Sequence, residues 1–223
     1  MRKLCFSIIA LLLVRLAAYA DDAHVTRVFV EREVNKLLET LNDKDLGPEQ
    51  KVSTVKDIAY GMFDIETMAK LVVGRYRRQF SEGQMREFTD LFLKQIEASY
   101  FNKVESFGEA KFEYETAIQT NVHYYVPSHV DFRGERYSIL YKLRRKNNAW
   151  RVWDVAVEGI SIVDLNRKQY EEMLQNTSVE GLLIMMRKKN AEMTTDSNLE
   201  ENRRQSLRGT NITAISNEHR GKE

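Results

Sequence analysis

The hydrophobic pattern of the chain changes period near residue 110, and this change constrains the fold more than any other feature. Before it, apolar residues recur at intervals of three and four, as on one face of an α-helix. After it, apolar and polar residues alternate, as along half-buried strands. Because strands that follow one another closely usually pair antiparallel, the sequence predicts an α+β protein with an antiparallel sheet.

Helices are predicted on both sides of the strand region. The signals are apolar stripes at helical spacing, the breaker pair Gly47-Pro48, and capping residues such as Asp64. Ser81 and Gln84 form a capping box ahead of a long helix rich in aromatic residues. The expected helices cover about 23–42, a stretch from Pro48 through Met62, Asp64 to about Gly74, Ser81 through Tyr100, about 164–175, and Ser178 to Lys189.

Asn147-Asn148 marks a hairpin turn between two of the strands. A two-residue loop would set Tyr141 against Asp154 and mix apolar and charged side chains on one face. A three-residue loop with a bulge is favoured because it gives one apolar face and one polar face. The pairs expected in that register are Leu143 with Trp153, Tyr141 with Val155, Ile139 with Val157, and Lys142 with Asp154. After Gly159 the chain is expected to leave the sheet.

The first twenty residues are typical of a signal peptide. They combine a basic start, an apolar run from Leu4 to Val14, and a small-x-small cleavage site at Ala18-Tyr19-Ala20. We expect residues 1–20 to be removed on export, residues 21–190 to form one domain, and residues 191–223 to form a disordered polar tail. The single cysteine, Cys5, lies in the leader, so the exported chain can use neither a disulfide nor a thiolate.

Charge points to no nucleic-acid partner. The leader carries three of the 34 lysine and arginine residues and none of the 33 acidic residues, so the rest of the chain is close to neutral. Basic runs at 75–78 and 142–146 are local and are interpreted first as solvated faces.

The titratable residues form no recognisable catalytic or metal-binding motif. His123 and His129 would lie about 20 Å apart along extended strands, too far to share a metal ion. Asp154 and Glu158 would lie about 13 Å apart, beyond the roughly 5–9.5 Å that the paired carboxylates of glycosidases need. We therefore expect no catalytic residue, no metal and no cofactor. Nothing in these residues calls for an enzyme, although an enzyme whose catalytic residues come from distant segments stays open at this point.

Several segments, in this order, resemble the MlaC family of periplasmic phospholipid-binding proteins, also called toluene-tolerance auxiliary proteins. The likeness spans about 25–190. It rests on FDIETMAKLVVGRY (63–76), the aromatic helix after it, YKLRRKNNAWRVWDVAVEGISIV (141–163) and LNRKQYEEML (165–174). The positions that match the family pattern are Phe63, Asp64, Met68, Ala69, Gly74, Arg75, Tyr76, Trp150, Val152, Asp154, Glu158, Gly159 and Ser161. The chain departs from the pattern at Arg77, where the family often has tryptophan, in the Asn147-Asn148 turn, and in its tail.

The resemblance implies an NTF2-like fold in which helices pack on a curved antiparallel sheet and enclose an apolar cavity for acyl chains. It implies a carrier, with phospholipid as cargo. The carrier would move between an inner-membrane ABC permease with its MCE-domain protein and an outer-membrane lipoprotein complex, in the periplasm. An exported NTF2-like enzyme using Asp154, Ser161 and His123, a carrier of another amphipathic lipid such as a hopanoid, and an adaptor that docks through its tail stay open as alternatives.

The expected cavity walls are the apolar stripes of the third and fourth helices and one face of the sheet. For each wall residue, a place in ordinary core is an equally good interpretation. An ion pair between Arg75 and a carboxylate such as Asp154 is favoured over a contact between Arg75 and a lipid phosphate. The candidate lipid-binding residues are Val72, Tyr76, Phe88, Phe92, Tyr100, Ile139, Tyr141, Trp153, Val155 and Val157.

Overall fold

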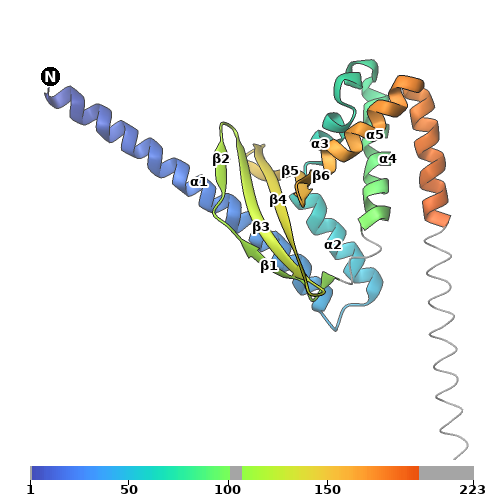
Figure 1. The fold of residues 1–223 in the computed structure, drawn as a ribbon, viewed down its shortest axis with the longest axis horizontal. Coiled ribbons are helices and arrows are strands. Elements are labelled where there is room, and N and C mark those ends of the chain that lie inside the picture. The colour runs from blue at the N-terminus through green and yellow to red at the C-terminus, as the bar shows by residue number, and fades with distance from the viewer. Residues whose placement is uncertain (1, 101–106, 196–223) are drawn as a thin grey trace, which may run out of the picture.

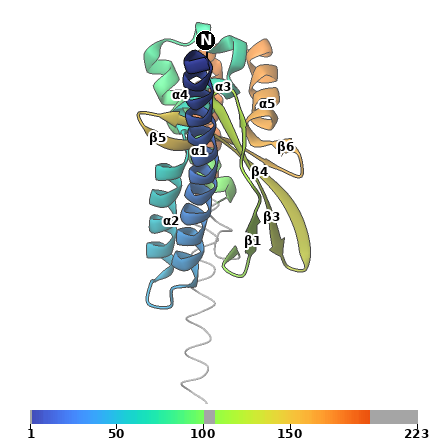
Figure 2. The same ribbon diagram turned by 90° about the vertical axis from the view of Figure 1, so that its left-hand side faces the viewer.

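The computed structural model describes residues 2–100 and 107–195, with side chains from 22–99 and 107–195. Helices combine with an antiparallel sheet, which confirms the predicted α+β class. Figure 1 shows the long N-terminal helix on one side of the sheet and a group of later helices on the other side. In Figure 2, helices α1 (Arg2–Asn42) and α2 (Pro48–Met62) run side by side along the molecule.

The sheet has the strand order β1-β3-β4-β5-β6, and the short strand β2 also pairs with β3. All of these pairings are antiparallel. The strands are β1 (Lys111–Tyr114), β2 (Ile118–Thr120), β3 (His123–Phe132), β4 (Glu135–Lys146), β5 (Ala149–Val157) and β6 (Ile160–Ser161).

The β4–β5 hairpin confirms the predicted register in part. Ile139 pairs with Val157, Tyr141 with Val155, and Lys142 with Asp154, as expected. The predicted three-residue loop is wrong, because Lys146 pairs with Ala149 across the two-residue turn Asn147-Asn148. Both asparagines have positive φ, 50° and 59°, which is the geometry of a type I′ turn.

The extra residue of the hairpin lies inside β5 and not in the loop. Leu143 pairs with Val152, so the predicted pair of Leu143 with Trp153 is wrong. The register shift falls between Lys142 and Leu143, opposite Trp153, and has the form of a β-bulge. The bulge places Trp153 on the face of the sheet opposite to Val152 and Val155, where its ring lies 5.3 Å from that of His123.

The chain also stays in the sheet two residues longer than predicted. Glu158 and Gly159, both with positive φ, form a second tight turn, and Ile160 then pairs back with Val157 as part of β6. The expectation that the sheet ends at Gly159 is therefore wrong, and the helix after it begins directly from Ser161.

The expected helices are present. Asp64 caps α3 by accepting a hydrogen bond from Thr67 N, and Ser81 with Gln84 forms the predicted capping box. Ser161 caps α5. The helices are α1 (Arg2–Asn42), α2 (Pro48–Met62), α3 (Ile65–Val72), the 3₁₀ helix η1 (Gly74–Gln79), α4 (Glu82–Tyr100), α5 (Ile162–Asn176), and a last helical segment covering 179–195.

Two predicted boundaries differ from these helices. Helix α1 runs through the predicted cleavage point, and cleavage itself stays a prediction. The last helical segment continues to 195, past the expected start of the tail at 191, while the rest of that tail lies outside the described residues. No helix within the described part of the chain is long and apolar enough to cross a membrane.

Buried apolar side chains form two separate clusters. The bundle cluster joins α3, α4, α5 and the last helical segment, and consists of Met68, Ala69, Val72, Val73, Phe88, Leu91, Phe92, Val163, Tyr170, Leu174, Val179, Leu182, Leu183 and Met186. The sheet cluster lies between α1 and one face of the sheet, and consists of Phe29, Val30, Val34, Met62, Ala117, Tyr124, Val126, Tyr141, Leu143, Trp150, Val152 and Val155. Phe63, which follows α2, packs against both clusters.

Candidate functional site

The sheet cluster contains the buried apolar side chains of one face of the sheet. Along β3, every second residue from Tyr124 to Val130 is buried, because alternate side chains point to the same face. Tyr141 and Leu143 of β4 and Val152 and Val155 of β5 continue this face. Helix α1 covers it, so the sheet and α1 form an apolar layer with aromatic side chains on the sheet side.

The apolar face continues beyond the cluster at one end of the sheet. Ile139 is only partly buried, and Val157 beside it is 38% exposed. Ile160, which pairs with Val157, is 61% exposed. The face is therefore buried in its middle and reaches solvent at this end.

The predicted lipid-binding residues of the sheet lie at or beside this face, with one exception. Tyr141 and Val155 belong to the sheet cluster, and Ile139 packs against it. Trp153 is the exception, because the bulge sends its ring to the opposite face, where Lys142 Nζ lies 5.6 Å from the ring centroid.

The predicted residues of the helices lie elsewhere. Val72, Phe88 and Phe92 are fully buried in the bundle cluster, and Tyr76 packs against that cluster. The side chain of Tyr100 lies outside the described residues. The expectation that the helical and sheet residues face each other across one cavity is wrong, because the helical residues pack on α5 and on the last helical segment.

Ten of the twelve residues of the sheet cluster are not among the predicted lipid-binding residues. The expected register puts Trp150 and Val152 on the polar face with Asp154, whereas the bulge returns them to the apolar face. The spacing of the α1 stripe predicts an amphipathic helix but does not reveal which surface the stripe packs on. The ten residues are Phe29, Val30, Val34, Met62, Ala117, Tyr124, Val126, Leu143, Trp150 and Val152.

Two polar atoms in the apolar layer lack hydrogen-bond partners among the described residues. They are the Tyr114 hydroxyl and Trp150 Nε1. Burial raises the pKa of Tyr114 above its ordinary value, with smaller contributions from Tyr141 and Glu31, and burial likewise raises the pKa of Tyr141. Neutral, unpaired polar groups in an otherwise apolar layer are unusual in a packed core and are suited to contact a polar ligand group.

A charged network joins the hairpin to the helices around Asp64. The buried Asp64 carboxylate accepts hydrogen bonds from Arg144 Nη2 at 2.8 Å, Lys146 Nζ at 2.8 Å and both polar groups of Thr67. Burial alone would raise the pKa of Asp64, but the hydrogen bonds from Lys146, Thr67 and Arg144 outweigh burial and hold this pKa well below its usual range. Asp64 N also donates to Val152 O, so the same residue fixes α3 to β5.

Two of the three candidate catalytic residues of the alternative hypothesis, Asp154 and Ser161, form a helix cap, whereas His123 lies on β3 with its ring 5.3 Å from that of Trp153. Ser161 Oγ donates to Asp154 Oδ2 at 2.6 Å and accepts from Asp164 N. Asp154 also accepts from Val163 N and pairs with Lys142 at 2.7 Å. These contacts start α5 and fasten it to β5, which accounts for the position of Asp154 and Ser161 without catalysis. Within the described residues, no cluster of side chains could hold a metal ion.

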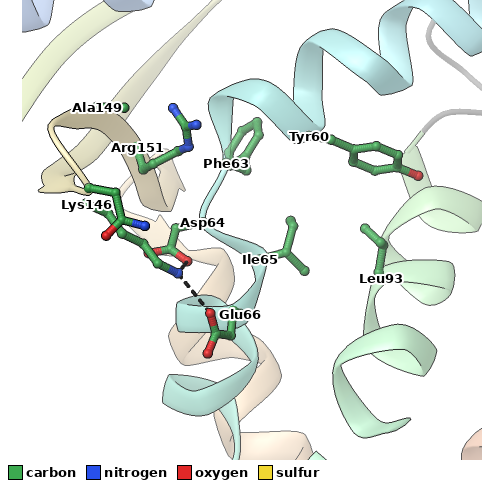
Figure 3. A pocket seen from close by; sticks show the side chains of 10 residues that line it. Tyr60, Phe63, Asp64, Ile65, Glu66, Leu93, Lys146, Ala149 and Arg151 are labelled. Carbon is green, nitrogen blue, oxygen red and sulfur yellow. Dashed lines mark hydrogen bonds and ion pairs between the residues drawn. The ribbon is translucent and has the colours of Figure 1, made fainter. Parts of the chain in front are cut away.

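Two hollows flank the β4–β5 turn. The first, the edge hollow, has a volume of about 440 Å³ and is lined by Tyr60, Phe63, Asp64, Ile65, Glu66, Leu93, Lys146, Asn147, Ala149 and Arg151. Figure 3 shows Arg151 and Lys146 on its strand side, with Tyr60, Ile65 and Leu93 opposite. Lys146 binds Asp64 and Glu66 there, so its charge is already compensated.

The second hollow, the α1 hollow, lies between the β4–β5 turn and α1 and has a volume of about 380 Å³. It is lined by His24, Val25, Val28, Phe29, Arg32, Asn148, Ala149, Trp150 and Arg151. Phe29 and Trp150 also belong to the sheet cluster, so this hollow adjoins the apolar layer directly.

The comparisons with known proteins agree with this architecture. A solved structure of a phospholipid-binding protein from Ralstonia solanacearum, in complex with a phospholipid, superposes with a TM-score of 0.68 at 21% identity. The match covers 75% of this chain and 98% of that chain. No curated protein matches the sequence significantly. The sequence model of the MlaC protein family matches residues 31–188, and the chain is therefore a member of the MlaC family.

Proposed function

We propose that this protein is a periplasmic phospholipid carrier, and that the acyl chains of its cargo bind in the layer between α1 and the sheet. The observation that carries the proposal is the sheet cluster, an apolar face that contains unpaired polar atoms and opens to solvent at one end. The phospholipid in the similarly folded protein from Ralstonia solanacearum supports this assignment.

The chemistry of the layer fits an acyl chain. Each methylene group moved from water into an apolar site contributes about 0.8 kcal/mol, so two chains supply a large gross free energy. Much of this free energy is also available in a membrane, so the exchange of lipid between protein and bilayer is close to balance. A carrier needs this balance, because cargo must be taken up and released.

Family membership supports a route for that cargo. We propose that the protein exchanges phospholipid with an inner-membrane ABC permease and its MCE-domain protein, and with an outer-membrane lipoprotein complex. The protein would then act as a binding and transport protein and not as an enzyme.

The test is mass spectrometry of an organic extract of the purified protein. We expect phospholipid in near-stoichiometric amount, and protein that purifies free of lipid would contradict the proposal. Transfer of labelled phospholipid between donor and acceptor vesicles, catalysed by the protein, would then test carriage.

Two matched substitutions locate the site. Val155→Phe fills the layer on the sheet face and should lower the lipid recovered per folded molecule, while the circular dichroism spectrum stays folded. Val72→Phe makes the same change in the bundle cluster and should lower stability by about 1–3 kcal/mol without changing lipid content. If Val72→Phe removes the lipid and Val155→Phe does not, the site lies in the bundle.

A further inference from the structure

The α1 hollow combines an apolar floor with positive charge. Among the described residues, its lining includes Val25, Val28 and Phe29 from α1 and Trp150 from β5, together with Arg32 and Arg151. Val25 and Val28 are each 38% exposed. The lining contains no carboxylate. The edge hollow on the other side of the turn, which Arg151 also lines, contains two, Asp64 and Glu66, and both of these carboxylates pair with Lys146.

Arg151 is the cation of this hollow that no carboxylate compensates. Within the described part of the chain it has no ion pair, although its neighbours on the hairpin all do. Arg144 and Lys146 pair with Asp64, and Arg145 lies 3.6 Å from Asp22. The four hydrogen bonds on Asp64 are complete without Arg151.

The guanidinium of Arg151 is nevertheless held in place. Its Nη1 donates to Trp150 O at 2.9 Å. Because Lys146 and Ala149 close the turn, the carbonyl of Trp150 points away from β4, so this bond fixes the guanidinium at the outer edge of β5. A guanidinium has five N–H donors, and this bond uses one of them.

A second unsatisfied donor lies in the same hollow. Trp150 is 8% exposed, and its Nε1 is buried without a partner among the described residues. Phe29 and Trp150 connect the hollow to the sheet cluster. An arginine without an ion pair, in a hollow that adjoins an apolar layer, matches an amphiphile with an anionic head, and a guanidinium binds phosphate in bidentate geometry.

We propose that the α1 hollow binds the phosphate of the cargo phospholipid, with Arg151 as its principal contact and Trp150 Nε1 as a second donor. This assignment rests on the proposed carrier function and orients the lipid, with its phosphate at the β4–β5 turn and its chains along the sheet. Because every glycerophospholipid carries this phosphate, the contact selects phospholipid over neutral lipid and not one headgroup over another. Arg75 does not provide this contact, because it lies exposed on η1 over the ring of Tyr76.

The experiment measures which lipid the delipidated protein takes from mixed vesicles. The vesicles contain phosphatidylglycerol and diacylglycerol with the same acyl chains, and the lipid bound to the re-isolated protein is quantified by mass spectrometry. The variants are Arg151→Gln and a matched control, Arg136→Gln, which changes an exposed arginine of β4 that pairs with Asp131 and lies outside the hollow lining. We expect Arg151→Gln to lower the ratio of bound phosphatidylglycerol to diacylglycerol about tenfold, and Arg136→Gln to leave it unchanged.

The possible outcomes distinguish a failure of the phosphate site from a failure of the proposed carrier function. If neither the wild-type protein nor any variant binds either lipid, the carrier function itself is contradicted. If wild type and Arg151→Gln bind lipid with the same ratio, the carrier function stands and the phosphate site is overturned. Inorganic phosphate serves as a competitor, and phosphate that binds wild type without displacing phosphatidylglycerol would assign the hollow to free phosphate and also overturn the headgroup site.

Discussion

The two apolar clusters contain similar residues but are built differently. In the bundle cluster, the rings of Phe88 and Phe92 stack on each other, and both meet Tyr170 edge-on at centroid distances of 5.2 and 6.3 Å. The Tyr170 hydroxyl donates to Gln95 Oε1 at 2.6 Å. In the sheet cluster, the buried hydroxyl of Tyr114 has no partner among the described residues.

This difference separates a core that maintains the fold from a surface that can accept a ligand. Closely packed rings leave no favourable place for an added molecule. A layer with unpaired polar atoms and an end open to solvent gains when a ligand supplies the missing contacts. Of the predicted lipid-binding residues, the described side chains of the helices belong to the first kind, and those of the sheet, apart from Trp153, belong to the second.

The largest expected effect comes from removing a ring in the bundle. Phe88→Ala should lower the free energy of unfolding by about 3–5 kcal/mol, because it leaves a cavity among fixed rings. Lipid content per folded molecule should not change. Phe29→Ala in the sheet cluster is the counterpart, and added phospholipid should restore part of its lost stability in urea unfolding. If lipid restores Phe88→Ala equally well, the two clusters do not differ as described.

The next largest effect should come from the Asp64 network, which connects α3 to the β4–β5 hairpin. Asp64→Ala removes the α3 cap and leaves Arg144 and Lys146 without their shared carboxylate, and should cost about 3 kcal/mol. Asp131→Ala is the control, because Asp131 pairs with Arg136 on the exposed face and should cost less than about 1 kcal/mol. In calorimetry, we expect the wild type to unfold in one transition and Asp64→Ala to unfold in two. If Asp64→Ala lowers the free energy of unfolding as little as the control does, the Asp64 network does not hold α3 to the hairpin.

The same carboxylate should make stability depend on acid pH. The pKa of Asp64 is lower in the folded protein than the ordinary value of about 3.9, so its contribution is complete above that value and is lost as pH falls below it. Asp64→Asn should therefore show a shallower fall in the free energy of unfolding than the wild type as the pH decreases from about 4. Parallel pH profiles would show that Asp64 titrates alike in the folded and unfolded chains.

The smallest effects are expected from removing single tyrosine hydroxyls. Tyr170→Phe leaves Gln95 buried without its donor and should cost about 1–3 kcal/mol. Tyr114→Phe removes a hydroxyl that has no partner in the described protein and should be neutral or slightly stabilising in lipid-free protein. Urea unfolding of the two variants checks the difference, and an equal cost for both would mean that Tyr114 is satisfied like Tyr170.

The sequence predicted elements and caps better than it predicted which surfaces face each other. The change of period gave the fold class, and local hydrogen bonding was enough to identify Asp64 and Ser81 as caps. The predicted register is right from Ile139 to Lys142 and wrong from Leu143 to the turn. The bulge at Trp153 moves the extra residue from the loop into the strand, and so it shifts every pair between the bulge and the turn by one residue. The partner of an apolar helical stripe is not encoded in its spacing, so Phe92 was placed opposite the sheet when it packs on α5. Arg151 gave no signal, since its lack of a carboxylate partner depends on the whole network around Asp64.

The most direct test of the central claim is to map where the lipid touches the protein. A phospholipid with a photoactivatable group near the end of one acyl chain can be loaded, crosslinked and located by peptide mass spectrometry. The account predicts labels on α1 near Phe29 to Val34 and on β4 and β5 near Tyr141 and Val155. Labels concentrated on α4 and α5 around Phe88, Phe92 and Tyr170 would contradict it.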